Sequence, residues 1–218
     1  MLIEYLNGDY NPNNYDREGL HASTMGNCPR AIYYSKVLGK KIKLDPRVKR
    51  IFATGDSFHS QMIRFLYAVP NIRVAAAEIN MPENGLIKGT TDAIIGIQSE
   101  NFIVDFKSMN SFGFKKLFEP KEEHLIQILI YLYYFKIRRG ILIIEDKNTC
   151  ELKEFIVDSF KAENQAIISE TLDKAKYLLD CIKNKIVPPK PIFTKDDKWK
   201  CKYCQYCKEC KEEVWDTS

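Results

Sequence analysis

Residues 89–108 read GTTDAIIGIQSENFIVDFKS, and this stretch decides the fold. Two apolar runs flank the polar turn QSEN (98–101), a pattern typical of a β-hairpin. Side chains two residues apart in a strand lie on the same face, so Asp105 and Lys107 are predicted to be neighbours. The turn also brings Asp92, in the preceding strand, close to Asp105. The sequence therefore predicts two carboxylates and one amine in a single place.

This grouping suits the metal-assisted hydrolysis of a phosphodiester. Carboxylate oxygens bind Mg²⁺ or Mn²⁺, and a neighbouring ammonium can steady or help to deprotonate the attacking water. We expect Asp92 and Asp105 to hold the cation, with the main-chain oxygen of Phe106 as a further ligand. Lys107 is expected to act on the water.

The tripeptide Asp/Glu-x-Lys is a weak signal on its own, because it begins at six positions: Asp105, Glu119, Glu145, Glu151, Asp196 and Glu209. For most of them a solvated pair of charges is the simpler interpretation. Asp105 differs because it lies inside an apolar strand, where an unpaired charge would be costly. Glu145 also ends an apolar strand, but no acid in the strands just before it would pair with it. We therefore favour Asp105.

Two residues upstream of the hairpin are further candidates. His59 lies on a helix predicted over 46–68, and its imidazole would supply a third metal ligand. A lone histidine is more often a surface or core residue. Glu78 lies in the first predicted strand, where a surface charge and a role in the site are both open.

A predicted helix over 121–136 carries three polar residues on one face. His124, Gln127 and Tyr131 are spaced i, i+3 and i+7, and residues at this spacing lie on the same side of a helix. One interpretation is a polar stripe that faces solvent. The other is a stripe that faces the sheet, with Gln127 and Tyr131 supporting Lys107 and positioning the substrate phosphate.

Periodicity assigns the other elements and predicts an α/β fold with a mixed central β-sheet flanked by helices. The expected helices are 28–38, 46–68, 121–136 and 159–186. The expected strands are 72–80, 86–97, 102–108, 140–146 and 151–157. Residues 110–120 contain Gly113 and Pro120 and are expected to form a loop.

Seven cysteines are present, and four of them lie in the tail CKYCQYCKEC (201–210). In a reducing compartment such a cluster usually binds metal. Cysteines at i, i+3, i+6 and i+9 rotate around a helix, so four of them surround one centre only if the backbone breaks. A ligand from elsewhere in the chain, or a zinc site made of all four, are the alternatives. Cys150 and Cys181 are interpreted as ordinary buried or half-buried thiols.

Four blocks together resemble the RecB-like branch of the PD-(D/E)xK nucleases. In chain order they are His59, GTTD ending at Asp92, Asp105-Phe106-Lys107, and Gln127-x-x-x-Tyr131. The resemblance implies a restriction-endonuclease-like core over residues 46–186. It also implies that His59, Asp92 and Asp105 bind one or two divalent ions.

The cysteines are similar to those of the CRISPR-associated Cas-four nucleases and their viral and plasmid relatives. That family carries one cysteine before the core and three after it, which jointly hold an iron–sulfur cluster. Cys28 opens CPRAIYY, and Cys201, Cys204 and Cys210 match the late block C-x2-C-x5-C. The resemblance implies a cluster, 4Fe-4S favoured over 2Fe-2S, that joins residues 1–45 to 187–218. Cys207 departs from the pattern, as a spare thiol or as the ligand in place of Cys210.

The resemblance implies a metal-dependent deoxyribonuclease that acts on single-stranded DNA or single-stranded ends. Exonuclease action is favoured, and endonuclease action stays open. The implied role is CRISPR prespacer processing in antiviral defence, with integration proteins as partners, or viral DNA processing. The alternatives are a DNA-binding adaptor with an idle nuclease site and a zinc-binding nucleic-acid-binding protein. Redox chemistry ranks low, because no G-x-G-x-x-G follows a strand.

Composition adds little to this reading. The formal net charge of +4 is a mild preference for polyanions and decides nothing alone. No apolar run is long enough to span a bilayer, and the first residues lack the pattern of a signal peptide. We expect a cytoplasmic protein without a membrane partner.

Overall fold

The computed structural model describes residues 19–38, 46–83, 85–191 and 198–212. Its elements, in chain order, are β1 (Leu20–His21), the 3-10 helix η1 (Ala22–Thr24), α2 (Pro29–Val37), α3 (Pro46–Ala68), β2 (Ile72–Asn80), β3 (Ile87–Lys88), β4 (Thr90–Ile97), β5 (Glu100–Met109), α4 (Ser111–Lys115), α5 (Glu122–Phe135), β6 (Arg139–Asp146), β7 (Leu152–Asp158), α6 (Ala162–Asn184), α7 (Lys198–Lys202) and α8 (Cys207–Glu212).

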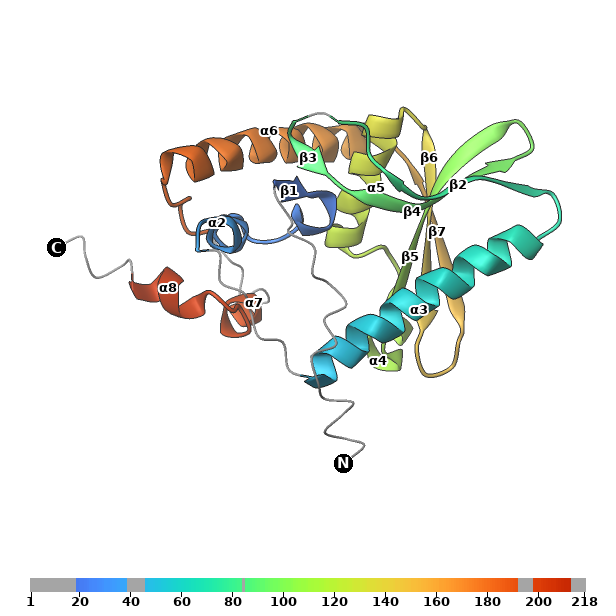
Figure 1. Cartoon of the computed structure of the whole chain (residues 1–218), viewed down its shortest axis with the longest axis horizontal. Helices are drawn as coiled ribbons and strands as arrows, with labels where there is room; N and C mark the ends of the chain where they lie inside the picture. Colours follow the sequence, from blue (N-terminus) through green and yellow to red (C-terminus); the bar gives the residue numbers. More distant parts are fainter. Residues whose placement is uncertain (1–18, 39–45, 84, 192–197, 213–218) are drawn as a thin grey trace.

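The central sheet has five strands in the order β2-β4-β5-β6-β7 (Figure 1). β5 and β6 run parallel, and the other neighbours are antiparallel. β4 and β5 form the predicted hairpin, and Gln98 in its turn has a positive φ of 54°. A small second sheet pairs β1 with β3 in parallel. The fold is therefore a mixed α/β fold with a mostly antiparallel sheet.

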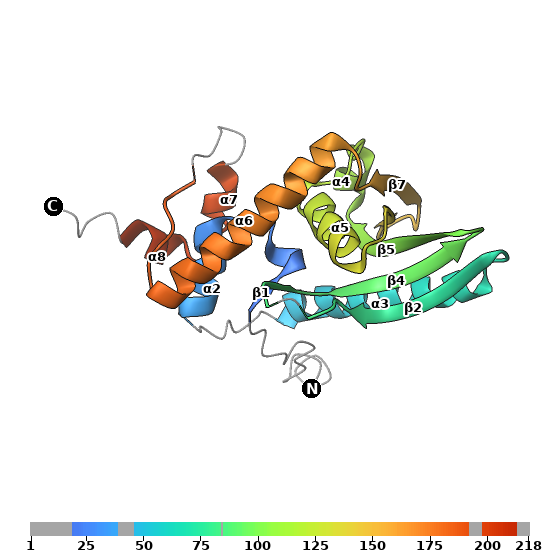
Figure 2. The same ribbon diagram turned by 90° about the horizontal axis from the view of Figure 1, so that it is seen from above.

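Helix α3 covers one face of the sheet, and α5 and α6 lie on the other face (Figure 2). α3 is amphipathic and buries Phe58, Met62 and Leu66 against the strands. Alternate residues of each strand face this helix, and the core between them includes Ala93, Ile95, Phe102, Val104, Phe106 and Ile141.

Helix α5 is buried because α6 covers its outer side. Its middle residues are apolar all round, and such a helix needs partners on every side. It packs on Ile103 and Leu142 of the sheet and on Ile168, Ala175 and Leu178 of α6. This core contains the N-terminal segment as well, through Leu20, Ala22 and Met25.

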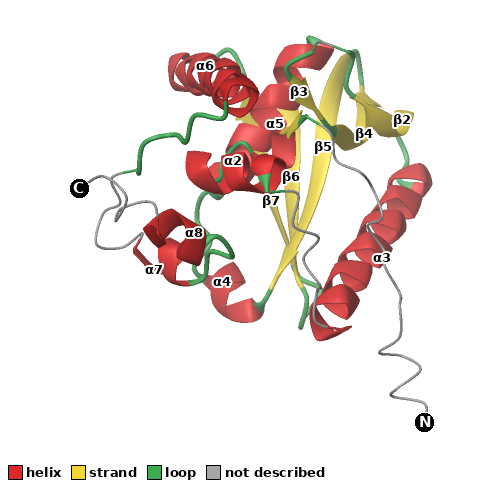
Figure 3. Ribbon diagram, turned by 60° about the vertical axis from the view of Figure 1, so that its left-hand side comes forward, coloured by secondary structure: helices red, strands yellow, loops and turns green. Residues whose placement is uncertain are grey.

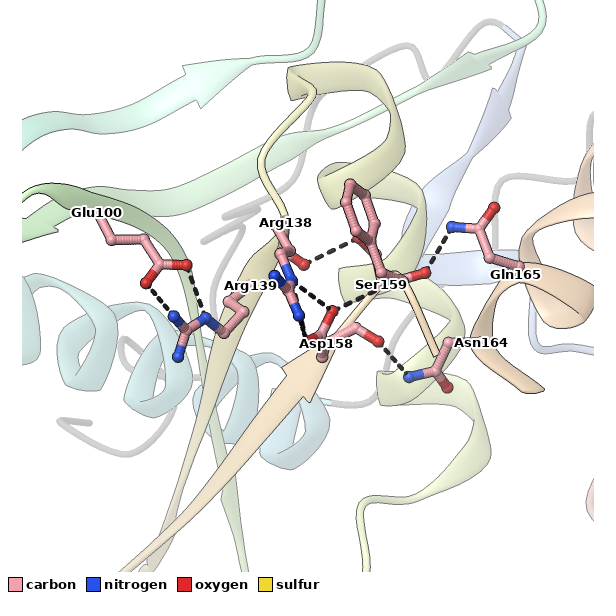
Figure 4. A network of polar contacts seen from close by, with 8 residues as sticks. Glu100, Arg138, Arg139, Asp158, Ser159, Asn164 and Gln165 are labelled. Atoms are coloured by element: carbon pink, nitrogen blue, oxygen red, sulfur yellow. Dashed lines mark hydrogen bonds and ion pairs between the residues drawn. The ribbon is translucent and has the colours of Figure 1, made fainter. Parts of the chain in front are cut away.

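A polar network fastens α6 to the sheet where β6, β7 and α6 meet (Figure 4). Arg138 donates to both carboxylate oxygens of Asp158. The side chains of Asn164 and Gln165, in the first turn of α6, donate to the main-chain oxygens of Asp158 and Ser159. Beside this network, the guanidinium of Arg139 pairs with Glu100 and fixes the start of β5 against β6.

The N-terminal segment and the cysteine-bearing tail lie side by side at one end of the molecule (Figure 3). Tyr34 of α2 and Tyr206 of the tail have ring centroids 5.9 Å apart. On the neighbouring side, Nζ of Lys174 in α6 donates to the main-chain oxygens of Met25 and Asn27 at 2.6 and 2.8 Å. The division of the chain into a core over 46–186 and a flanking unit stays a prediction.

Every helix and strand predicted from periodicity is present, with two corrections. Residues 110–120 are not only a loop, since Ser111–Lys115 form α4. The strand predicted over 86–97 is two strands that are interrupted at Gly89. A Cβ at Gly89 would lie 2.8 Å from the Tyr131 ring, so the chain is closely packed at this interruption. The tail, for which no element is predicted, contains α7 and α8.

Residues 1–18, 39–45, 84, 192–197 and 213–218 lie outside the described structure, and so does part of each predicted flanking region. Among the helices that are described, no segment has both the length and the apolar character that a membrane crossing requires.

Candidate active site and sulfur cluster

Strands β4 and β5 separate at the position of Asp92. Their antiparallel pairing ends where Ala93 lies opposite Val104, so Asp92 and Asp105 come next, at the opening between the strands. The main-chain N–H of Phe106 donates to Oδ2 of Asp92 at 2.6 Å. A carboxylate thus takes the place of a main-chain partner, and this contact fixes Asp92 beside β5.

His59 on α3 holds the same carboxylate through its other oxygen. Nδ1 of His59 lies 3.0 Å from Oδ1 of Asp92. The imidazole also makes edge-to-face contacts with Phe58 and Phe106, at centroid distances of 5.9 and 6.2 Å. Burial by itself lowers the pKa of His59, but the hydrogen bond and the charge of Asp92 outweigh it, so the pKa lies above its ordinary value. His59 and Asp92 form one hydrogen-bonded unit.

Asp105 is buried and ion-paired with Lys107. Its side chain is 1% exposed, and Oδ2 lies 2.5 Å from Nζ of Lys107. Burial raises the pKa of Asp105 to about 6; the charge of Lys107 lowers it and the charge of Asp92 raises it. The predicted proximity of Asp105 and Lys107 is therefore present, and the second carboxylate is near enough for its charge to act on the first.

The predicted metal ligands His59, Asp92 and Asp105 come together from α3, β4 and β5. In the described part of the chain no group of three or more His, Cys, Asp or Glu side chains, the cysteines included, is arranged to hold a metal ion. At this site Asp92 bonds His59 and Asp105 pairs with Lys107. The chemistry of the donor set nevertheless fits Mg²⁺ or Mn²⁺. Burial and a like charge both destabilise ionised Asp105, and a bound cation would reverse this effect.

The polar stripe of α5 does not face solvent at Gln127 and Tyr131, so the first interpretation is wrong for these two residues. Gln127 and Tyr131 are buried, and Nε2 of Gln127 donates to the Tyr131 hydroxyl at 2.9 Å. Burial, and then the charge of Lys107, lowers the pKa of His124 to about 4. His124 is thus near Lys107, and its Nδ1 is buried without a hydrogen-bond partner among the described residues. The roles of Gln127 and Tyr131 toward Lys107 stay predictions.

The competing candidates differ from Asp105 in their surroundings. Glu145 is half-buried near the end of β6. Burial raises its pKa, and the nearest charges are those of Lys147 and Asp146. Glu78 is exposed on β2 with a positive φ of 48°. Neither the preference for Asp105 nor a role for Glu78 is decided by these positions.

A sulfur-rich site forms where α2 meets the tail. Cys28 precedes α2 as its N-terminal cap residue, Cys201 lies in α7, and Cys207 and Cys210 lie in α8. Cys204, between the two short helices, packs with Cys210 against the Tyr33, Tyr34 and Tyr206 cluster. The break between α7 and α8 turns the backbone, so the four tail cysteines do not wind along one continuous helix.

The charges of Cys28 and of the other tail cysteines act on the thiols of Cys201 and Cys204. Burial raises the pKa of the Cys201 thiol, and the charges of Cys28, Cys210, Cys204 and Cys207 raise it further. Burial likewise raises the pKa of Cys204, to which Cys28 contributes. The donor set, all thiols, fits iron–sulfur and zinc chemistry alike. The remaining two are Cys181, which is buried as predicted, and Cys150, which is exposed at the β6–β7 turn, so the prediction of a buried Cys150 was wrong.

Sequence reasoning missed a cation beside these sulfurs. Nη1 of Arg30 lies 3.6 Å from Sγ of Cys210, and its Nε donates to the main-chain oxygen of Pro188 at 2.6 Å. The only signal was the position of Arg30 two residues after Cys28, and a single arginine near a cysteine is not specific.

No protein-family model and no curated protein matches the sequence. Solved structures nevertheless share the fold. The crystal structure of SSO0001 aligns with a TM-score of 0.59 at 20% identity and covers 95% of this chain and 94% of that chain. A phage related exonuclease from Haemophilus somnus 129PT aligns with a TM-score of 0.54 at 13% identity, over 77% of this chain and 96% of that one.

The alkaline exonuclease LHK-Exo from Laribacter hongkongensis aligns with a TM-score of 0.51 at 12% identity, and the alignment covers 77% of this chain and 89% of that chain. At these identities the likeness shows a common fold.

Proposed function

We propose that the protein is a divalent-metal-dependent deoxyribonuclease. The observation that carries the proposal is the meeting of Asp92, Asp105 and Lys107 at the opening between β4 and β5. Two structures that share the fold are an alkaline exonuclease and a phage related exonuclease, which supports hydrolysis of DNA.

Each residue of the site has a chemical task in this proposal. His59, Asp92, Asp105 and the main-chain oxygen of Phe106 would hold Mg²⁺ or Mn²⁺, which supplies Lewis-acid activation of phosphate and water. Lys107 orients the water and stabilises negative charge on the phosphate. Gln127 and Tyr131 support the position of Lys107 from α5.

We further propose that Cys28, Cys201, Cys204 and one of Cys210 or Cys207 hold an iron–sulfur cluster. The proximity of these thiols supports the proposal, and the contact of Arg30 with Cys210 favours Cys210 over Cys207. A 4Fe-4S cluster is preferred to 2Fe-2S. A zinc ion bound by the tail cysteines is the competing proposal.

The substrate that we propose is DNA that is single-stranded or has single-stranded ends. Trimming of such DNA would serve CRISPR prespacer processing beside integration proteins, or the processing of viral DNA. Gene neighbours would separate these two roles.

The nuclease is tested with end-labelled single-stranded DNA and Mn²⁺ or Mg²⁺. Asp105→Asn removes the buried negative charge and keeps the shape, so cleavage should fall about a hundredfold or more. Glu145→Gln is the matched control, since it changes the competing Asp/Glu-x-Lys motif, and it should cleave like the wild type. Equal loss in both variants, or none in Asp105→Asn, would contradict the assignment.

The second candidate is a DNA-binding adaptor with an idle site. The ion pair between Lys107 and Asp105 favours it, because the amine occupies an oxygen that a metal would need. Binding of DNA without cleavage under any divalent ion would support the adaptor.

A further inference from the structure

The segment that follows the candidate catalytic strand exposes two large aromatic rings. Residues 111–118 read SFGFKKLF and begin two residues beyond the end of β5 at Met109. Phe112 is 73% exposed and Phe118 is 84% exposed, whereas Phe114 between them is buried. Most phenylalanines are buried in folded proteins, so two exposed rings beside a candidate active site call for an explanation.

Each exposed ring has an ammonium group beside it. Nζ of Lys116 lies 4.1 Å from the centroid of the Phe112 ring, and Nζ of Lys153 lies 5.7 Å from that of Phe118. The stretch 111–118 holds two lysines and no acid, and Glu119 is the first acid after it. The surface therefore alternates flat apolar rings with positive charges.

The short helix α4 that carries this surface is fixed at both ends. At its start, the Ser111 hydroxyl donates to Oδ1 of the buried Asp146 at 2.8 Å, and Oδ1 of Asn110 accepts from the Gly113 N–H at 2.9 Å. At its end, Nζ of Lys153 donates to the main-chain oxygens of Phe114 and Leu117 at 2.6 and 2.9 Å.

The inner side of the same segment is anchored by packing, since Phe114 and Leu117 are buried against Ile144 of β6. The exposed rings are thus held on a rigid support, and a binding partner need not order the segment first.

We propose that Phe112 and Phe118 are a stacking platform for the bases of single-stranded DNA, with the ammonium group of Lys116 beside its phosphates and Lys153 fixing the support from below. The inference rests on the proposed nuclease function and names the residues that would bind the unpaired bases of its substrate. Rings that alternate with cations match a strand that alternates bases with phosphates. A protein partner would fit a continuous apolar patch better, whereas each ring here has a charge beside it.

The platform also has a place in the path of the strand. β5 runs from Asp105 and Lys107 directly into Asn110 and α4. A strand whose phosphate lies at Lys107 and whose next bases stack on Phe112 and Phe118 needs unpaired bases, because stacking on a protein ring requires a free base face.

The test measures binding of a fluorescent oligothymidine in EDTA, so that no cleavage occurs. The double variant Phe112→Ala/Phe118→Ala should raise the Kd about tenfold or more, with a much smaller effect on a duplex of the same length. Phe160→Ala is the matched control, since Phe160 is 68% exposed and lies 5.2 Å from the Arg138 guanidinium. Its Kd should stay at the wild-type value.

The outcomes distinguish a failure of the stacking-platform proposal from a failure of the nuclease proposal. Unchanged binding in the double variant, an equal effect on duplex DNA, or no binding of single strands by the wild type would overturn the platform, whatever the cleavage assay gives. Absence of cleavage by the wild type would refute the nuclease, and the binding assay in EDTA would still judge the platform. If the double variant unfolds, Lys116→Glu replaces it, and its Kd should rise by a similar factor.

Discussion

At the scale of the residue, Asp105 is the carboxylate of the site whose ionised form is destabilised by burial and by a neighbouring negative charge. It is almost fully buried, and the ammonium that pairs with it is also the amine that the proposed reaction uses. Charged groups with shifted pKa values are typical of functional sites. The ion pair with Lys107 stabilises the ionised form of Asp105, which burial alone would disfavour.

Removal of Lys107 is therefore expected to destabilise the protein. Lys107→Met leaves a buried carboxylate without its partner and should lower the free energy of unfolding by about 3 kcal/mol. The double variant Asp105→Asn/Lys107→Met should regain most of this loss, because no charge stays buried. Urea unfolding at pH 7 measures both, and equal stability of the two variants would contradict the expectation.

His124 gives stability a dependence on pH. Its pKa is about 4 in the folded protein and ordinary in the unfolded chain, so below about pH 6.5 the unfolded chain binds the proton and the folded protein does not. This histidine therefore makes stability fall as the pH drops from about 7 to about 4. His124→Gln should show a smaller fall when urea unfolding is compared at pH 7 and pH 5.

Asp105 has the opposite effect on stability over part of this pH range. Because its pKa is raised, the folded protein takes up this proton at a higher pH than the unfolded chain does, which favours the folded state as the pH falls. That contribution is common to the wild type and His124→Gln and cancels in the comparison. An equal fall in both proteins would show that His124 has no such effect.

At the scale of the element, Gly89 decides how β3 and β4 meet α5. A Cβ at this position would lie 2.8 Å from the Tyr131 ring and 3.1 Å from Sδ of Met81. Gly89→Ala should lower stability by about 1–3 kcal/mol through overpacking. Gly55→Ala is the control, since the described structure leaves open space there and alanine favours the helix α3. Thermal unfolding of both variants measures the difference, and a Gly89→Ala variant as stable as the wild type would refute the close-packing argument.

The sequence predicts long periodic elements well and packing effects poorly. α3 and β2 begin and end where the pattern places them, because their residues repeat at a clear period. The close packing at Gly89 involves Tyr131, which is distant in sequence. α4 has five residues, and its hydrogen bonds to Asp146 and Lys153 are long-range. No local pattern reports such contacts.

In the candidate site, too, local geometry could be predicted and long-range packing could not. The proximity of Asp105 and Lys107 comes from strand geometry alone and could be predicted. The hydrogen bond of His59 to Asp92 depends on how α3 packs on the sheet through Phe58. Motif order predicts His59 as a metal ligand beside Asp92, and the hydrogen bond between them is known only from the structure.

At the scale of the whole molecule, the tail and the N-terminal segment hold each other. Tyr34 and Tyr206 pack together, and Arg30 contacts both Pro188 and Cys210. A cluster shared between Cys28 and the tail would cross-link segments from the two ends of the described chain. Such a link stabilises because it restricts the unfolded chain.

Cys28→Ser tests this link. Anaerobically purified wild type should be brown and contain iron and sulfide, and Cys28→Ser should lose most of the iron and have a tail that trypsin cleaves faster. Cys150→Ser is the control, because Cys150 is exposed at the β6–β7 turn. Cys207→Ser and Cys210→Ser identify the fourth ligand. A colourless wild type with one equivalent of zinc would refute the cluster.

The hydrogen bonds from Lys174 to the main chain of Met25 and Asn27 span 149 and 147 residues. During synthesis, Met25 and Asn27 are made long before Lys174, so these hydrogen bonds cannot form until α6 has been translated. Contacts this distant in sequence form late and slowly. On the ribosome, all strands of the β-sheet are made before α6 leaves the exit tunnel, so the N-terminal segment docks on α6 after the sheet is complete.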